Sequence, residues 1–384
     1  MTHERSWSEA RAAAWAAAHP LPRISQPLAR CLGHLLGEPL IAKTDLPAFD
    51  TSAMDGWAVA GDGPWKVYGT VLAGEPAAAL AAGEAVEIAT GARVPPGATA
   101  VLRSEHGVLD GTSLSGTVDP GGNIRRRGEE CSAGDLLLPA AARVTPAVVG
   151  LAAAAGFDEL SVVNRPDVWA FVVGDELLHS GLPHGSHIRD ALGPLLAGWL
   201  TQLGARTCDV RHVPDTHTAL IDAVRGSSAH VIVTTGGTAH GPADHLRSVL
   251  AELGSEVLVD GVRVRPGHPM LLARLDGGVL LVGLPGNPLA AVTGVVTLLA
   301  PVIAALLGEP ALPCHRVRLA EAATGHPVDT RIIPVMNGVP VRLSGPAMLR
   351  GLASADALAV IPPGGAERKD EVEVLPLPWA APAY

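Results

Sequence analysis

The fold is decided by one stretch, Val231-Ile-Val-Thr-Thr-Gly236-Gly237-Thr238-Ala-His240-Gly241-Pro-Ala-Asp244-His245-Leu246. Its β-branched residues 231–233 predict a buried strand, and the glycine pair lets the backbone turn sharply and approach a ligand. From Asp244 onward, apolar residues at 246, 249 and 250 have helical spacing. A strand, a glycine turn and a helix N-terminus present free N–H groups and a positive dipole to phosphate in α/β proteins.

Acidic residues follow the predicted strands of this region. Asp175 and Glu176 come after a strand at 168–173, Asp215 follows a strand at 205–213, and Asp244 lies at the mouth of the glycine turn. Each can cap a helix, and local spacing alone favours a cap for Asp244. Three acidic sites at strand ends together indicate a cation site or acid–base chemistry.

Strands and helices alternate over residues 163–307, which predicts an α/β domain with a mostly parallel sheet. Its helices are expected at 194–203, 216–224 and 289–307. The last of these is 19 uncharged residues, long enough for a membrane span, but Gly294 and Pro301 interrupt it. We interpret it as a buried helix of the α/β domain.

Short alternating apolar runs with many turns predict a small inserted β-domain over residues 43–134, and a second β-domain over 308–384. Residues 1–42 and 135–162 read as a helical linker domain, in which residues 21–42 continue a helical pattern. Thr145 and Pro146 begin a helix there and Gly156 ends it. We expect that helix to pack on the N-terminal one.

Bulk composition excludes several classes of function. The net charge of −10 gives no basic surface for nucleic acid or an anionic membrane. The four cysteines are far apart and form no Cys-x-x-Cys pair, which argues against a zinc site or a disulfide framework and indicates a reducing, cytoplasmic location. Mixed charges in residues 1–20 argue against a signal peptide.

Several loops carry further candidate residues. Arg263, Arg265 and His268 surround Pro266-Gly267, which makes a basic loop suited to an oxyanion or, equally, a solvated hairpin. The small-residue turns near Asp55 and Thr90 expose these side chains or are ordinary turns. The run Arg125-Arg-Arg127 with the acids after it is typical of a solvated face.

Seven motifs follow one another over about residues 43–290. They are Leu46-Pro-Ala-Phe-Asp50-Thr-Ser-Ala-Met-Asp55-Gly-Trp-Ala-Val59, Ile88-Ala-Thr90-Gly-Ala-Arg93-Val-Pro95, Asn123-Ile-Arg-Arg-Arg-Gly-Glu129, Gly174-Asp-Glu-Leu177, Thr235-Gly-Gly237 through Asp244, Pro266-Gly-His-Pro269 and Leu284-Pro-Gly-Asn-Pro288. In sequence and in order, these motifs resemble those of the molybdopterin molybdenumtransferase family (MoeA and the gephyrin E-domain).

The resemblance implies an elongated four-domain subunit that forms a homodimer. Its parts would be a MoaB/Mog-like doubly wound α/β domain, an inserted β-domain, a helical linker domain and a C-terminal β-barrel-like domain. The family transfers molybdate to adenylylated molybdopterin, with Mg²⁺ present, and releases AMP. A separate molybdopterin adenylyltransferase is a further candidate partner, and neither nucleic acid nor membrane is expected.

The resemblance also implies roles for single residues. Asp55, Glu176 and Asp244 would be catalytic, and Asp215 and Asp244 would hold the metal. Asp55, Thr90 and Glu130 would reach the site from the partner subunit. Molybdate would contact Arg265, His268, Arg331 and Ser344. The substrate-binding set would be Ser52, Thr90, Glu130, Asp190, Gly236, Gly237, Thr238, Pro285 and Asn287.

Some positions depart from the family pattern. The family's Lys-Pro-Gly-Lys-Pro loop reads Arg265-Pro-Gly-His268-Pro269, which changes the geometry of one cation and makes the charge of the other depend on pH. Its Asp/Asn-Ser-Asn becomes Asp190-Ala-Leu192. These departures leave two alternatives: a divergent paralogue with altered oxyanion use, such as tungstate, and a non-catalytic molybdopterin-binding dimeric scaffold. The retained acidic residues favour an enzyme.

Overall fold

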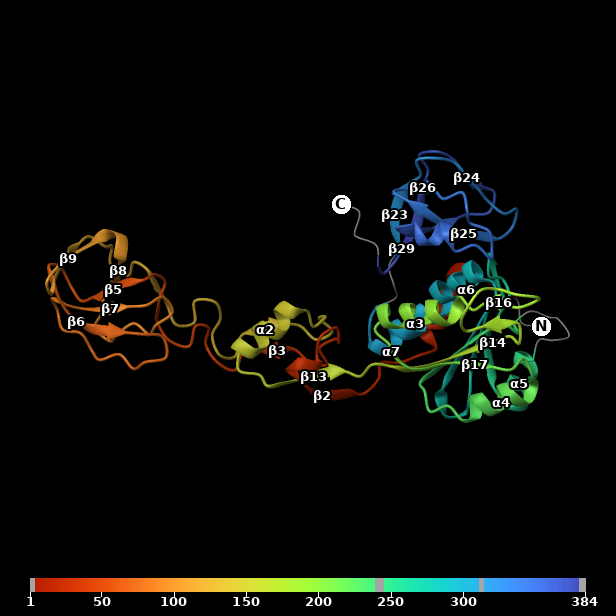
Figure 1. Ribbon diagram of the computed structural model, residues 1–384, viewed down its shortest axis with the longest axis horizontal. Coiled ribbons are helices and arrows are strands. Elements are labelled where there is room, and N and C mark those ends of the chain that lie inside the picture. The colour runs from red at the N-terminus through yellow and green to blue at the C-terminus, as the bar shows by residue number, and fades with distance from the viewer. Residues whose placement is uncertain (1–3, 239–244, 311–313, 380–384) are drawn as a thin grey trace. The chain divides into compact units, whose positions relative to one another are not determined.

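The computed structural model describes residues 4–238, 245–310 and 314–379 (Figure 1). The chain forms two compact units. One is Ser25–Val162, and the other joins Met1–Ile24 to Val163–Tyr384.

The larger unit is built on a six-stranded sheet in the order β17-β14-β18-β22-β21-β19. The first four strands are parallel, and β21 runs antiparallel to both of its neighbours, β22 and β19. The strands are β14 (Asp167–Val173), β17 (Arg206–Val213), β18 (Val231–Thr235), β19 (Glu256–Asp260), β21 (Leu271–Arg274) and β22 (Leu280–Leu284). The chain order reverses between β14 and β18, where doubly wound sheets bind ligands at the carboxyl ends of their strands.

Helices cover both faces of this sheet, as the alternating pattern predicts (Figure 1). Two apolar clusters fill the two faces. One face carries α3 (Leu192–Gln202) and the continuous run α6 (Pro288–Gly294), η4 (Val295–Leu299) and α7 (Ala300–Leu307); the other carries α4 (His217–Arg225) and α5 (Leu246–Glu252). The run Pro288–Leu307 is long and apolar enough to cross a membrane, but it is fully buried in this unit. The prediction of a buried helix is therefore confirmed.

The N-terminal helix α1 (Trp7–Ala16) differs from expectation because it packs on α7 and η4. Its Ala10 and Ala14 are fully buried there, and Trp7 Nε1 donates to Thr297 Oγ1 at 3.1 Å. Small alanines form a flat apolar stripe that fits the uncharged α7, so the expectation that α1 packs on the helix at 145–156 is wrong. That helix, α2 (Pro146–Ala154), lies in the other unit and has the predicted Thr145 cap.

A second, mixed sheet carries the C-terminal part of the larger unit. Its path is β1-β20-β25-β27-β29-β23, with β26 paired to β25. The bounds are β1 (Arg5–Ser6), β20 (Val262–Arg265), β23 (His315–Arg318), β25 (Thr330–Met336), β26 (Val339–Pro340), β27 (Ala357–Ile361) and β29 (Glu371–Pro376). Strand β20 pairs in parallel with β25, which places Arg265 beside Arg331. This pairing joins the basic loop to the last domain.

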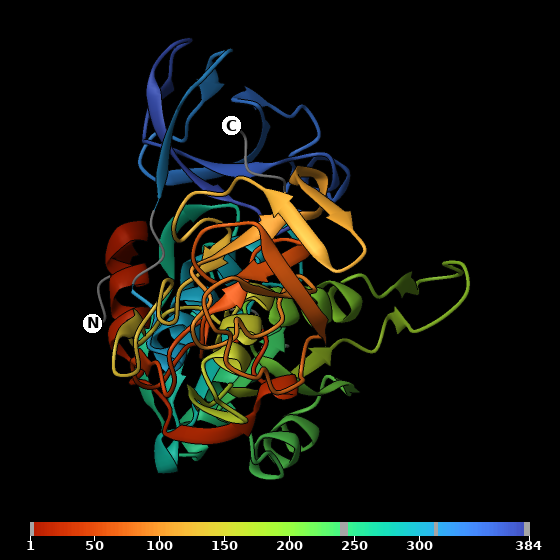
Figure 2. The ribbon, with the colours of Figure 1, turned by 90° about the vertical axis from the view of Figure 1, so that its left-hand side faces the viewer.

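Shorter elements complete the larger unit. The short strands β15 (Leu177–Leu178) and β16 (Ile188–Arg189) pair in parallel, and the segment that contains them extends outward, seen in yellow-green in Figure 2. The others are η3 (Asp276–Gly278), α8 (Arg350–Ala353), β24 (Ala323–Thr324) and β28 (Gly365–Ala366).

The smaller unit holds the predicted inserted β-domain, a six-stranded sheet in the order β8-β5-β7-β6-β10-β9. Its strands are β5 (Gly56–Val59), β6 (Trp65–Val71), β7 (Glu84–Ile88), β8 (Ala100–Arg103), β9 (Gly107–Asp110) and β10 (Ser113–Gly116). The remaining elements are β2 (Arg23–Pro27), η1 (Leu28–Arg30), β3 (Leu40–Ile41), β4 (Thr51–Ser52), η2 (Ser104–His106), β11 (Ile124–Arg125), β12 (Leu136–Leu138) and β13 (Glu159–Val163). The helical pattern expected over 21–42 is wrong, because Pro22 and Pro27 favour the extended β2 instead.

Candidate functional site

The glycine turn after β18 lies at the reversal point of the parallel sheet. Gly236 and Gly237 have φ values of 82° and 63°, a region that favours glycine. The Gly236 N–H donates to the Leu284 carbonyl at 2.9 Å, and a Cβ on Gly286 would lie 3.7 Å from the Gly236 Cα. The turn after β18 and the turn that contains Pro285 therefore lie together, as the sequence predicts.

The acidic residues after β14 and β17 also meet. The Asp215 N–H donates to Asp175 Oδ1 at 3.2 Å, and the Glu176 carboxylate lies over Gly174, with Oε2 2.8 Å from where a Cβ would stand. Asp244 is outside the described residues. Over the parts of the chain that the structure describes, no group of three or more His, Cys, Asp or Glu is arranged to hold a metal. The metal role of Asp215 stays a prediction.

Two predicted substrate residues have structural contacts. Asp190 Oδ1 accepts from the N–H groups of Leu192 and Gly193, at 2.8 and 3.1 Å, and so caps α3. Thr238 is 2 % exposed, and its methyl group lies against Gly283 of β22. Their contacts with substrate stay predictions.

A cavity of about 320 Å³ brings the predicted molybdate residues together. Arg265, His268, Arg331 and Ser344 all line it, although they come from two separate parts of the sequence. Pro285 and Asn287 of the turn after β22 line it as well, so the basic loop and this turn share one space. We call this space the basic cavity.

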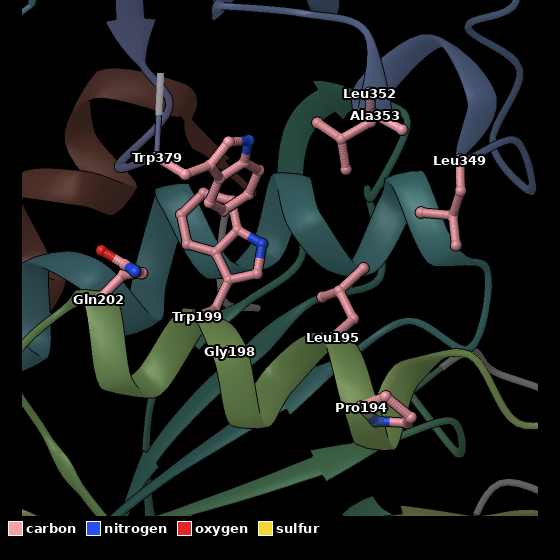
Figure 3. A pocket seen from close by; sticks show the side chains of 9 residues that line it. All are labelled: Pro194, Leu195, Gly198, Trp199, Gln202, Leu349, Leu352, Ala353 and Trp379. Atoms are coloured by element: carbon pink, nitrogen blue, oxygen red, sulfur yellow. The ribbon is translucent and has the colours of Figure 1, made fainter. Parts of the chain in front are cut away.

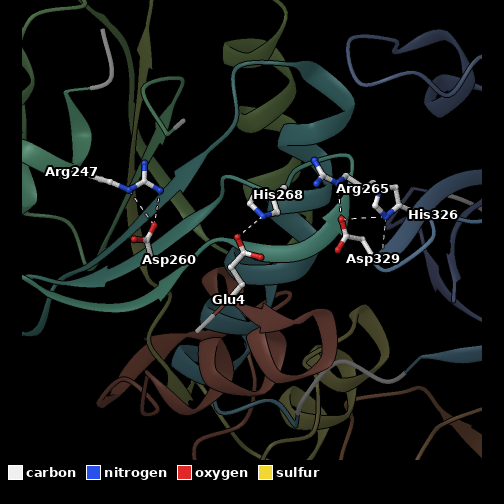
Figure 4. Close-up of polar contacts among 7 residues, drawn as sticks. All are labelled: Glu4, Arg247, Asp260, Arg265, His268, His326 and Asp329. Atoms are coloured by element: carbon white, nitrogen blue, oxygen red, sulfur yellow. Dashed lines mark hydrogen bonds and ion pairs between the residues drawn. The ribbon is translucent and has the colours of Figure 1, made fainter. Parts of the chain in front are cut away.

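Three basic side chains of the basic cavity are hydrogen-bonded to other parts of the chain, and Figure 4 shows the partners of Arg265 and His268. Arg265 Nε donates to Oδ2 of the buried Asp329 at 2.8 Å, and His268 Nε2 donates to Glu4 Oε1 at 2.9 Å. Arg331 Nη1 donates to a backbone carbonyl at 2.8 Å. These bonds fix the cations in place before any anion arrives. The sequence interpretation missed Glu4 and Asp329, although an acid two residues before Arg331 was a usable signal.

The backbone of the basic loop is pressed against α6. Gly267 has a φ of 106°, and a Cβ there would lie 3.0 Å from the Ala290 carbonyl oxygen. The Arg265–Pro266 peptide bond is cis. Only glycine fits at position 267 without displacing α6.

In the smaller unit, Asp55 and Thr90 are neighbours. Asp55 Oδ1 accepts from the Thr90 N–H at 2.7 Å and from its hydroxyl at 3.0 Å. These two bonds, the N–H first, lower the pKa of the Asp55 carboxyl below its ordinary value of 3.8. Ser52 is fully buried, and its hydroxyl donates to the Met54 carbonyl at 2.5 Å. Glu130 is exposed, and its N–H donates to the Leu46 carbonyl at 2.8 Å.

The triple-arginine run is tied to its own domain. Arg126 Nη1 pairs with Asp50 at 2.7 Å, and Arg127 Nε pairs with Asp45. The pKa of Asp50 is lowered, first by the Arg127 N–H and then by the Arg126 side chain. All three arginines are exposed, so the interpretation of the run as a solvated face is confirmed.

The doubly wound domain, with a glycine turn at its reversal point and a basic cavity, has the fold and the residue types of an α/β protein with a site suited to anions. Three family models match the chain. They are the MoeA N-terminal region (domain I and II) at residues 5–156, a probable molybdopterin binding domain at 169–305, and the MoeA C-terminal region (domain IV) at 316–377.

Known proteins resemble the chain over most of its length. The molybdopterin molybdenumtransferase of Staphylococcus aureus (strain MSSA476) is 31 % identical over 304 residues, 75 % of this chain and 72 % of that protein. The molybdopterin molybdenumtransferase of Synechococcus elongatus is 32 % identical over 314 residues, which are 77 % of this chain and 78 % of that protein. A crystal structure of the molybdopterin biosynthesis MoeA protein from Pyrococcus horikoshii is 26 % identical, with a TM-score of 0.79 over 97 % of this chain and 98 % of that one. The chain belongs to the molybdopterin molybdenumtransferase family, which confirms the resemblance seen in the sequence.

Proposed function

We propose that this protein transfers molybdate to adenylylated molybdopterin and releases AMP, as a step of molybdenum cofactor biosynthesis. One observation carries the proposal: the basic cavity gathers Arg265, His268 and Arg331 beside the turn that contains Pro285 and Asn287. A dianion needs fixed positive donors at its oxygens. A pterin-sized ligand lying along that turn would place its dithiolene close to them.

The phosphate end of the substrate would lie at the reversal point of the sheet. There the glycine turn would offer the Gly237 N–H, since the Gly236 N–H donates to the Leu284 carbonyl. Asp175, Glu176 and Asp215 lie at the same edge. Oxygen donors of this kind suit Mg²⁺, and we assign the ion to Asp215 and Asp244. Bound Mg²⁺ would neutralise charge on the phosphoanhydride.

Cleavage of a phosphoanhydride by water depends on positioning and charge neutralisation more than on covalent chemistry. The chain supplies both. Glu176 is exposed at the edge of the sheet, where it can orient a water, and the glycine turn can donate to phosphate oxygens. This division of labour needs no nucleophilic side chain.

A homodimer would complete the site. Asp55, Thr90 and Glu130 are all exposed in the smaller unit, and we propose that these residues of the partner subunit face the substrate. The protein would work in the cytoplasm on substrate from a separate molybdopterin adenylyltransferase.

The test is AMP release from adenylylated molybdopterin, with and without Mg²⁺ and with molybdate or tungstate. We expect release that needs both Mg²⁺ and molybdate, and its loss in Asp244→Ala. The double variant Arg265→Ala, His268→Ala should lose the dependence on molybdate. Arg263→Ala is the matched control, because Arg263 lies exposed on the same strand and does not line the basic cavity.

The outcomes separate the alternatives. Preference for tungstate in the wild type would support the divergent paralogue. Pterin binding without AMP release would support the scaffold. Unchanged molybdate dependence in the double variant would show that the basic cavity is not the oxyanion site.

A further inference from the structure

The glycine turn after β18 is hydrogen-bonded by the side chain of Arg247, for which the proposed function gives no role. Arg247 of α5 donates through Nη1 to the Thr238 carbonyl at 2.6 Å. Its Nη2 and Nε both reach Asp260 Oδ1 of β19, at 2.5 and 3.2 Å (Figure 4). Both side chains of the pair are about three-quarters buried, with exposures of 24 % and 25 %.

This contact acts directly on the glycine turn. Thr238 directly follows the Gly236–Gly237 pair, and glycine has the widest backbone freedom of any residue. The Thr238 side chain is pinned by burial over Gly283, where a Cβ would lie 3.0 Å from its methyl carbon. Arg247 fixes the other part of the residue, its carbonyl. Together the two contacts hold Thr238, the residue directly after the glycine pair, through its side chain and its carbonyl.

We infer that Arg247, oriented by Asp260, is a positioning residue that aims the Gly237 N–H of the glycine turn at the phosphate of the substrate. This inference rests on the proposed function, in which that turn receives the phosphate. A guanidinium suits the task, because its planar fork can bond a carbonyl and a carboxylate at once. Phosphate binding by backbone N–H groups depends on their being aligned beforehand.

The chain offers a closely matched control on the same sheet. Arg274 of β21 also bonds one carboxylate and one carbonyl, Glu256 at 2.5 Å and Ala17 at 3.3 Å. It does not touch the glycine turn. Arg274→Gln therefore removes the same kind of ion pair and carbonyl bond at a site without a link to phosphate.

The experiment measures the Kd of AMP by calorimetry, with KM and kcat of the full chain, for Arg247→Gln, Arg247→Lys, Asp260→Asn and Arg274→Gln. Arg247→Gln should raise Kd and KM about tenfold, the usual effect of losing a charged hydrogen bond, while kcat changes by less than about twofold. Arg247→Lys and Asp260→Asn should fall between it and the wild type. Arg274→Gln should match the wild type.

Wild-type Kd and KM in Arg247→Gln, or an equal rise in Arg274→Gln, would overturn the inference. If the wild type does not bind AMP at all, the proposed function fails, and amide exchange at Gly237 then decides the positioning role. Faster exchange in Arg247→Gln than in Arg274→Gln supports the role, whereas equal exchange rejects it.

Figure 3 shows an apolar pocket elsewhere in the same unit, which Trp199 and Trp379 help to line. Their rings pack edge to face, with the ring centroids 4.9 Å apart. The pocket lies on α3, whose Leu195 and Trp199 point into it. It contains neither Arg247 nor the glycine turn. Arg247 variants are therefore expected to leave this pocket unchanged.

Discussion

Replacing Arg265 by glutamine should destabilise the protein through Asp329. Asp329 is only 4 % exposed, and Arg265 Nε donates to its Oδ2 at 2.8 Å. The nearby His326 Nδ1 lies 3.3 Å from the same oxygen, but it already accepts the Asp329 N–H at 3.0 Å. A ring nitrogen that accepts a hydrogen bond carries no hydrogen, so His326 Nδ1 cannot donate to the Asp329 carboxylate. Without Arg265, the carboxylate would be left buried and without its donor.

The magnitude follows from that burial. An unsatisfied buried acceptor costs about 1–3 kcal/mol, and we expect about 2 kcal/mol here. For a unit of this size, Tm falls by about 2–4 °C per kcal/mol, which gives a decrease of about 4–8 °C. Adding Asp329→Asn should recover about 1 kcal/mol, because an amide is less costly to leave unpaired than a carboxylate.

Thermal unfolding followed by circular dichroism measures these differences, and molybdate calorimetry follows binding in parallel. Arg263→Gln on the same strand is the control and should change Tm by less than about 1 °C, as exposed substitutions usually do. If Arg265→Gln has the same Tm as Arg263→Gln, or if Arg265→Gln with Asp329→Asn is no more stable than Arg265→Gln alone, the buried Asp329 carboxylate does not depend on Arg265. The reasoning about the basic cavity would then be refuted.

Three further predictions concern single positions. Thr90→Val removes one of the bonds that lower the pKa of Asp55, so a carboxyl NMR titration should show a higher Asp55 pKa in the variant. A lowered pKa stabilises the folded protein above the ordinary value of 3.8, and this stabilisation is lost as the pH falls through the folded-state pKa. The variant should therefore lose less stability on acidification than the wild type. Gly267→Ala should lower the free energy of unfolding in urea by about 1–3 kcal/mol, because the new Cβ would lie 3.0 Å from the Ala290 carbonyl oxygen of α6. Gly198→Ala, on α3 with no atom within 4 Å of the new Cβ, should raise it by about 0.5–1 kcal/mol. Equal effects of the two substitutions would contradict this reasoning. Asp190→Ala should lose about 1 kcal/mol with the α3 cap, and Asp190→Asn should lose less; an unchanged Tm in Asp190→Ala would show that the cap is dispensable.

Local features of the fold could be predicted because their causes are local. The β-branched run 231–233, the glycine pair and the spacing after Asp244 predict a strand, a turn and a helix, and the structure has β18, the turn and α5 in those places. The Thr145-Pro146 start of α2 was predicted by the same kind of argument. Backbone geometry and neighbouring side chains alone set these features.

Other features needed the packed chain. The N-terminal helix packs against α7 rather than α2, since its alanine stripe is compatible with many surfaces and the sequence does not name one. The residues that restrain the site were missed for a related reason. Arg265 and Asp329 are 64 residues apart, and His268 and Glu4 are 264 residues apart.

The sequence by itself determined the family, the alternation of strands and helices, and the residue types of the phosphate turn and the basic loop. Each of these is written in a short motif or a local period. Only the tertiary structure decided which carboxylate faces which cation, and that Arg247 fixes the Thr238 carbonyl. The physical reason is that such contacts form when distant segments are buried together, and their energy depends on distance and burial rather than on sequence spacing.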